Sequence, residues 1–258
     1  MKGSWLVPVA PPAPRPAPRL RLVCIPFAGG DATVFRDWAP GLPREVELLG
    51  VEPPGSLRRI MEPPVRSLEA ALEGLWNELA ELPTLPLALF GSCTGSFLAF
   101  ELARRLEADG RAPAHLFCSS VWAPQLPSRH APIHALGDDE FLEALQGLGA
   151  LPAETLAQPE LLEVLTPAAR ASFEAAETYA MEPGSEVSCA LTAISGARDA
   201  LVSKDELEAW SERTSGGFRS VLLDGGHAIW TECREELLST LAADLAGPLA
   251  SGREEVRL

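Results

Sequence analysis

Short apolar runs bounded by glycine or proline recur along the chain, and stretches of helical period separate most of them. Between runs, residues 67–82 and 96–108 repeat leucine at spacings of three and four, which indicates amphipathic helices. Most of the runs are apolar on successive residues, as in strands covered on both faces. The alternation predicts an α/β protein with a mainly parallel sheet, with strands within residues 19–27, 46–51, 86–92, 114–121, 187–196 and 218–224.

One region, residues 133–185, interrupts this alternation because it holds consecutive helical patterns with no strand between them. Three helices are expected there, at about residues 138–146, 159–165 and 167–181. Loops at the carboxyl ends of parallel strands lie beside the ligand site in such folds. The region therefore predicts a helical lid inserted at that edge, and a purely structural helical layer is the alternative.

Length and charge restrict the remaining possibilities. A chain of 258 residues, 47% of them apolar, suits one large domain. Its net charge of −15 opposes binding to nucleic acid and to anionic membranes, and no run approaches the roughly 18 to 20 apolar residues of a membrane helix. Residues 1–18 are too rich in proline for a secretory signal, so they predict an extended arm before a domain at 19–258, in a cytoplasmic protein.

The five cysteines are odd in number and share no spacing typical of a metal site, so neither a disulfide framework nor a zinc site is expected. His130 and His134 lie four residues apart near the expected lid, but no further ligands accompany them. His115 begins an expected strand and has a structural role in this interpretation. We therefore predict no metal and no bound cofactor.

The segment Gly91-Ser92-Cys93-Thr94-Gly95 joins an apolar run to an amphipathic helix. This context is that of a nucleophile elbow, G-x-Nuc-x-G, with cysteine in the central position. Small residues on both sides of the nucleophile let the helix pack against the strand, and the helix N-terminus stabilises a thiolate. The alternative is a plain strand-to-helix turn in which Cys93 is a small apolar residue.

Two further residues follow later strands in the order expected of a catalytic triad. Asp199 comes after the run at 187–196, and His227 comes after the run at 218–224. His227 would accept the proton of Cys93, and Asp199 would fix the tautomer of the imidazole. Asp205 and Asp224 are rivals for the acid, but Asp224 is close to His227 in sequence and Asp205 begins an expected surface helix.

The turn Pro26-Phe27-Ala28-Gly29-Gly30 follows the first long apolar run. Backbone N–H groups in such a turn can complete an oxyanion hole, and the N–H of the residue after the nucleophile supplies the other half. We therefore expect the donors to be Ala28 and Thr94. A phosphate-binding role is the competing interpretation, but the turn lacks G-x-G-x-x-G and a Walker lysine.

Together the motifs PFAGG, GSCTG, GARDALVS and GGHAIW resemble the type II thioesterases that accompany nonribosomal peptide and polyketide synthases. The resemblance extends over nearly the whole chain after the arm and includes the helical lid. It implies an α/β-hydrolase fold, with Cys93 as nucleophile, Asp199 and His227 as its partners, and Ala28 with Thr94 as oxyanion donors. It also implies a monomer and an acyl group delivered on the phosphopantetheine arm of a carrier protein.

Two positions depart from the family pattern. The elbow usually reads G-H-S-x-G, whereas this chain has Ser92 and Cys93, and the stretch GVEPPGSLRRIMEPP matches the family's L-P-G-R-x-x-R loop only in part, with Ser56 where arginine is common. A serine nucleophile converts a thioester into a more stable oxoester. A cysteine exchanges one thioester for another, so the acyl group stays activated toward a second thiol or an amine.

Three functions follow from these residues. The first is hydrolysis of acyl or aminoacyl thioesters of carrier proteins through an acyl-Cys93 intermediate. The second is transfer of the acyl group to another carrier thiol or an amine, and the third is a binding module without turnover. Carrier proteins are generally acidic, as is this chain, so docking would rely on local features such as Arg58, Arg59 or Arg129 near the site. The sequence does not identify the acyl group.

Overall fold

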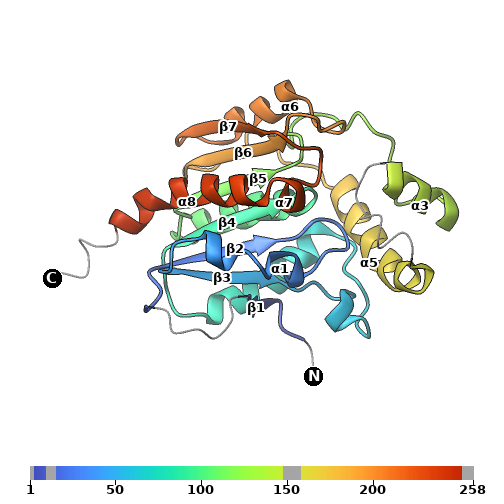
Figure 1. The fold of residues 1–258 in the computed structure, drawn as a ribbon, viewed down its shortest axis with the longest axis horizontal. Helices are drawn as coiled ribbons and strands as arrows, with labels where there is room; N and C mark the ends of the chain where they lie inside the picture. The colour runs from blue at the N-terminus through green and yellow to red at the C-terminus, as the bar shows by residue number, and fades with distance from the viewer. Residues whose placement is uncertain (1–2, 10–15, 148–157, 252–258) are drawn as a thin grey trace.

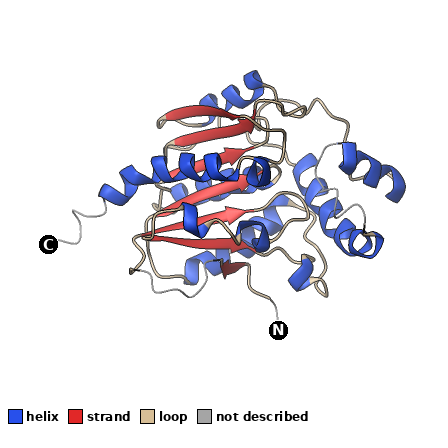
Figure 2. Cartoon of the chain, in the orientation of Figure 1, coloured by secondary structure: helices blue, strands red, loops and turns tan. Residues whose placement is uncertain are grey.

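A computed structural model describes residues 3–9, 16–147 and 158–251. Seven strands of the described chain form one sheet in the order β1-β3-β2-β4-β5-β6-β7 (Figures 1 and 2). Only β1 is antiparallel to its neighbour, and every other pair is parallel. The strands are β1 Leu6–Pro8, β2 Leu20–Ile25, β3 Val46–Val51, β4 Leu87–Ser92, β5 His115–Ser119, β6 Leu191–Gly196 and β7 Phe218–Leu223.

The sheet separates two apolar clusters. On one face, α1 (Leu68–Glu81) and α2 (Gly95–Ala108) pack on the strands, and the Ser67 hydroxyl caps α1 by accepting a hydrogen bond from the backbone N–H of Ala70. The other face is covered by α8 (Arg234–Ser251), which lies in front of the sheet in Figure 1, together with short helical turns. Because β2, β5 and β6 are buried at every residue, these strands need the continuous apolar runs seen in the sequence.

The six strands predicted from the sequence are present, which confirms the α/β class. The run at 187–196 forms a strand only from Leu191 onward, because Val187 makes an isolated bridge to Thr214 instead. A further strand, β1, lies within the segment predicted as an arm, and the Glu78 carboxylate accepts hydrogen bonds from the backbone N–H groups of Trp5 and Leu6. Residues 10–15 of that segment lie outside the described residues, so the arm boundary stays a prediction.

Two helices, α3 (Asp138–Gly147) and α5 (Pro159–Glu177), lie beyond one end of the sheet (Figure 1). The sequence predicted a break near Pro167, but α5 runs through it. Pro167 has no backbone N–H, so the helix lacks one backbone hydrogen bond there. In the same turn, the Thr166 hydroxyl donates a hydrogen bond to the Leu162 carbonyl at 2.6 Å. The prediction of two separate helices was therefore wrong, while the expected extent of the lid insertion remains a prediction.

Short helical segments complete the described chain. Four of them are 3-10 turns, and none of the helices in the described residues is long and apolar enough to cross a membrane. Their bounds are η1 Ala32–Phe35, η2 Ala39–Gly41, η3 Leu57–Arg59, α6 Lys204–Glu208, η4 Ala209–Arg213 and α7 Ile229–Glu232.

Candidate active site

Cys93 lies at the turn between β4 and α2, with φ of 50°, a backbone conformation that few residues other than glycine adopt. The flanking glycines have a steric cause. A Cβ on Gly91 would lie 2.3 Å from the Ser96 Cα, and one on Gly95 would lie 2.4 Å from the Pro26 carbonyl oxygen. The G-x-C-x-G spacing therefore lets α2 start directly against the strand ends, and it leaves the Cys93 side chain partly exposed.

Asp199 and His227 meet at the carboxyl ends of β6 and β7. The His227 Nδ1 and the Asp199 Oδ2 are 3.0 Å apart, and the Asp199 side chain is fully buried. The Ser195 hydroxyl and the Leu201 backbone N–H also donate to this carboxylate, at 2.9 and 2.8 Å. Burial alone would raise the pKa of Asp199, but the hydrogen bonds with His227, Leu201 and Ser195 outweigh it and lower the pKa.

The His227 imidazole also interacts with Cys93. Burial lowers the pKa of His227, but hydrogen bonds with Asp199 and Cys93 and the charges of both groups outweigh burial and raise the pKa to about 10. These contacts favour the protonated imidazole, and an imidazolium beside a cysteine stabilises a thiolate. The three residues predicted from the sequence come together at one end of the sheet.

The sequence did not reveal what holds His227 in place. The Ser120 hydroxyl donates to the His227 carbonyl at 2.9 Å, and Ser120 has φ of 53° directly after β5. A Cβ on Gly196 would lie 2.0 Å from the Gly226 carbonyl oxygen, so the acid loop and the histidine loop approach closely only because residue 196 is glycine. A serine just after a strand and a glycine before an acidic residue are common in sequences, so they do not by themselves predict these two contacts.

Ala28 lies in the loop after β2, and Thr94 follows Cys93 as the N-cap residue of α2. Neither backbone N–H donates to another group in the described part of the chain. The neighbouring Gly29 N–H, by contrast, points to the Ser172 hydroxyl of α5 at 3.4 Å. These two N–H groups are thus left available to a ligand, and their role as oxyanion donors remains a prediction.

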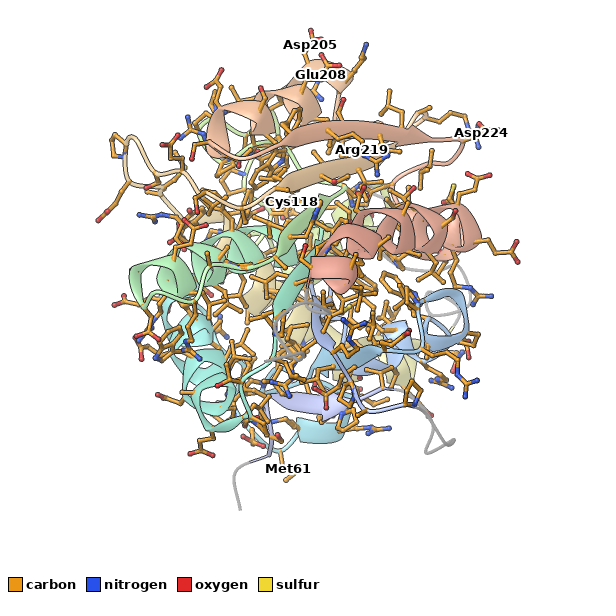
Figure 3. The ribbon with its side chains drawn as sticks, turned by 90° about the vertical axis from the view of Figure 1, so that its left-hand side faces the viewer. Met61, Cys118, Asp205, Glu208, Arg219 and Asp224 are labelled. Carbon is orange, nitrogen blue, oxygen red and sulfur yellow. The ribbon has the colours of Figure 1, made fainter. Side chains whose placement is uncertain are left out.

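The rival acids point elsewhere. Asp224 forms an ion pair with Arg198, and Asp205 lies on α6, both at the periphery of the molecule in Figure 3. Ser92 is completely buried at the end of β4, and its hydroxyl has no hydrogen-bond partner within the described residues.

The remaining candidates have structural contacts. His134 Nδ1 lies 2.6 Å from Glu177 Oε2, and His115 Nε2 lies 2.9 Å from the Thr192 hydroxyl. The described residues contain no group of three or more His, Cys, Asp or Glu side chains that could hold a metal. Arg59 corrects one expectation: it is 7% exposed because it binds Glu62 and the Glu52 carbonyl, so it is not available for docking.

A cavity of about 260 Å³ adjoins Cys93 and His227 beside helix α5. Its lining includes Cys93, Thr94 and His227. Helix α5 closes one side through Phe173, and the loop after β5 closes another. Helices α3 and α5 are themselves joined by an apolar cluster that includes Phe141 and Phe173 and reaches Ala28 in the turn after β2. Helices α3 and α5 thus contact the turn that carries Ala28.

This parallel sheet, with a sharp elbow and an acid and a histidine on later strands, defines the α/β-hydrolase class. Residues 20–245 match the model of the thioesterase domain family, and the chain belongs to this family.

Similar proteins come from biosynthetic systems. The chain is 33% identical to gramicidin S biosynthesis protein GrsT of Aneurinibacillus migulanus, covering 91% of this chain and 92% of that one. It is 35% identical to thioesterase PikA5 of Streptomyces venezuelae, over 90% and 83% of the two chains. Among solved structures, the type II thioesterase BorB from the borrelidin biosynthetic cluster superposes with a TM-score of 0.86 at 33% identity, covering 95% and 99%.

Proposed function

We propose that this protein acts on acyl or aminoacyl thioesters of carrier proteins in nonribosomal peptide or polyketide biosynthesis, through an acyl-Cys93 intermediate that water releases. The observation that carries the proposal is the imidazole of His227, placed between the buried Asp199 carboxylate and the Cys93 thiol. The names of the similar proteins support the biosynthetic setting. The phosphopantetheine arm belongs to the substrate in this proposal, and the enzyme needs no cofactor.

Acylation uses the thiolate–imidazolium pair. The Cys93 sulfur attacks the thioester carbonyl carbon, and the carbonyl oxygen becomes an oxyanion that accepts hydrogen bonds from the backbone N–H groups of Ala28 and Thr94. When the intermediate collapses, the bond to the pantetheine sulfur breaks and the His227 imidazolium donates its proton to that sulfur. The products are a free carrier thiol and acyl-Cys93, with a neutral imidazole.

Deacylation follows from the loss of one charge. Once Cys93 is acylated, it no longer holds a thiolate that favours the protonated imidazole, so the pKa of His227 is lower in the acyl-enzyme than in the free enzyme. Neutral His227 can then remove a proton from water, which attacks the acyl carbon. The second tetrahedral intermediate expels the Cys93 thiolate and releases the acid.

Transfer is the second candidate, and the cysteine at the elbow favours it. Exchange between two thioesters is nearly thermoneutral, so acyl-Cys93 can pass its acyl group to a second carrier thiol or an amine. In a Cys93→Ser variant the acyl group would be an oxoester, a less activated donor, so we expect acylation to persist while transfer to a thiol falls. A serine variant that transfers as quickly as the parent contradicts this bond-exchange argument.

Intact-mass spectrometry after incubation with a loaded carrier tests the proposal. We expect an acyl adduct in the parent protein, located on Cys93 by peptide mapping, and none in Cys93→Ala. The other four cysteines are buried and provide the internal control, since none should be labelled. The absence of any adduct in the parent would favour a carrier-binding module. Adding an empty second carrier then separates hydrolysis, which yields free acid, from transfer.

A further inference from the structure

Four aromatic rings stand on the walls of the cavity beside Cys93, here called the acyl chamber: Phe97, Trp122, Phe173 and Tyr179. Phe97 packs edge-on against Trp122 at 5.9 Å between ring centroids, and it lies 5.5 Å from the ring of Tyr179. Aliphatic side chains and three prolines also line the acyl chamber, among them Val121, Leu126, Ile133 and Leu201. The chamber therefore offers a ligand mainly apolar and aromatic contacts.

Most polar side chains of the acyl chamber are already hydrogen-bonded within the protein. The two Glu177 oxygens accept from the backbone N–H groups of Ile133 and His134 at 2.9 and 3.0 Å. The Tyr179 hydroxyl binds Glu101, and the Ser120 hydroxyl binds the His227 carbonyl. A polar acyl group would therefore lose its hydrogen bonds to water and find few replacements inside the chamber.

Charge discriminates further. Among the described residues, those that line the acyl chamber include no lysine or arginine and one acidic side chain, Glu177. His130 is exposed, and His227 serves the reacting sulfur. An acyl group that ends in a carboxylate would be buried beside a like charge with no dedicated cation to pair with it.

The size of the acyl chamber indicates what fills it. A protein cavity of about 150 Å³ binds benzene, and this chamber holds about 260 Å³. A two-carbon acyl group would leave most of this volume unfilled and would make few contacts with the four rings. A phenyl ring attached through a short linker would reach those walls and pack against them.

We propose that the acyl chamber selects bulky apolar acyl groups, aryl-bearing ones in particular, over acetyl and over dicarboxylic acyl groups such as malonyl. This inference rests on the proposed function, because it assumes that the thioester carbonyl reaches Cys93. Contacts in the chamber raise the rate of acylation where they also stabilise the transition state. Discrimination then follows from apolar area, whose effect for one methylene is roughly 10- to 200-fold.

The test compares phenylacetyl, acetyl and malonyl thioesters loaded on one carrier protein, with the rate of acyl-Cys93 formation as readout. We expect the specificity constant, kcat/KM, to be at least about tenfold higher for the phenylacetyl thioester than for the acetyl thioester. The malonyl thioester should react most slowly. Equal rates, or faster reaction of acetyl or malonyl, would overturn the selection. If none of the three thioesters acylates Cys93, the proposed function itself fails.

Substitutions in α5 and in the loop after β5 test whether the walls of the acyl chamber cause the preference for apolar acyl groups. Ala176 lines the acyl chamber, whereas Ala180, four residues later, is exposed and does not line it. Ala176→Leu should lower the ratio of the phenylacetyl to the acetyl acylation rate at least about tenfold, while Ala180→Leu should leave this ratio at the parent value. Trp122→Ala should also reduce the phenylacetyl-to-acetyl ratio. Ratios that stay at the parent value in both chamber variants would contradict the assignment, since misfolding lowers both rates together.

Discussion

Replacing Asp199 by asparagine tests the central interaction of the site. The Asp199 carboxylate accepts from His227 Nδ1, the Ser195 hydroxyl and the Leu201 N–H, so an isosteric amide must turn a donor toward at least one of these donors. If the amide faces His227, the imidazole must shift its proton from Nδ1 to Nε2, the nitrogen on the far side of the ring from Asp199. The ring would then lose both its preferred tautomer and much of its positive charge.

The pKa of His227 sets the scale of the effect. A rise from 6.5 to about 10 corresponds to about 5 kcal/mol of preference for the imidazolium, at about 1.4 kcal/mol per pH unit. Asp199 and Cys93 share this stabilisation. If half belongs to Asp199, the substitution removes about 2 to 3 kcal/mol, which is roughly 30- to 150-fold in the ratio of imidazolium to neutral imidazole at a given pH. Near pH 10, where the parent imidazole is about half protonated, we expect acylation to slow by at least roughly tenfold.

Single-turnover release of the carrier thiol, measured from pH 6 to 10.5, is the assay. In the parent, the rate should fall as the pH rises through the raised pKa of His227 near 10. In Asp199→Asn the fall should begin at lower pH. Asp224→Asn and Asp205→Asn are matched controls, because both carboxylates lie at the periphery of the molecule (Figure 3) and neither binds His227. A variant that keeps the parent rate and pH profile would refute the role of Asp199.

Three other changes have defined outcomes. Gly95→Ala places a Cβ 2.4 Å from the Pro26 carbonyl oxygen and should lower the free energy of unfolding in urea by about 2 kcal/mol or more, whereas Gly217→Ala, with nothing within 4 Å, should change it little. Arg58 is exposed and lies three residues before Met61, which is 93% exposed. Arg58→Glu should raise KM for a carrier-bound thioester while leaving KM for a small thioester unaffected. An unchanged KM for the carrier-bound thioester would exclude Arg58 from docking. Burial lowers the pKa of His115 to about 4, so below pH 6.5 the unfolded chain binds more protons than the folded one. The free energy of unfolding should therefore decrease as the pH falls from 6.5 to 4, by up to about 3 kcal/mol. In His115→Gln this contribution to the pH dependence of the free energy of unfolding should be absent.

Much of the fold follows from local pattern because the central strands are buried on both faces. Six strands and the helices α1 and α2 could be predicted, since fully buried strands need uninterrupted apolar runs and amphipathic helices need a stripe. The edge strand β1 was not predicted, because its pairing with β3 depends on residues more than forty positions away. The continuity of α5 through Pro167 depends likewise on packing that a local rule for proline does not include.

The site divides in the same way. Cys93, Asp199 and His227 could be predicted because each follows a strand, and parallel strands bring their carboxyl ends to one edge. The contacts of Ser120 and Gly196 could not, because they depend on how two loops cross. Arg59 illustrates the opposite error: a basic residue in a predicted loop looks available, but the loop folds back so that Arg59 binds Glu52 and Glu62.

The identity of the nucleophile and the character of the acyl chamber bear on the same question, the fate of the acyl group. Acyl-Cys93 keeps the reactivity of a thioester, so the outcome depends on which nucleophile reaches the carbonyl carbon. A bulky apolar group in the chamber would exclude water from the side of the four rings, where few polar groups remain free to hold it. Water or a second thiol must then approach from the side of His227, where the same imidazole can deprotonate either one. Hydrolysis and transfer therefore share every residue of this site and differ in the competing acceptor, so the ratio of free acid to transferred acyl group should vary with the concentration of acceptor thiol.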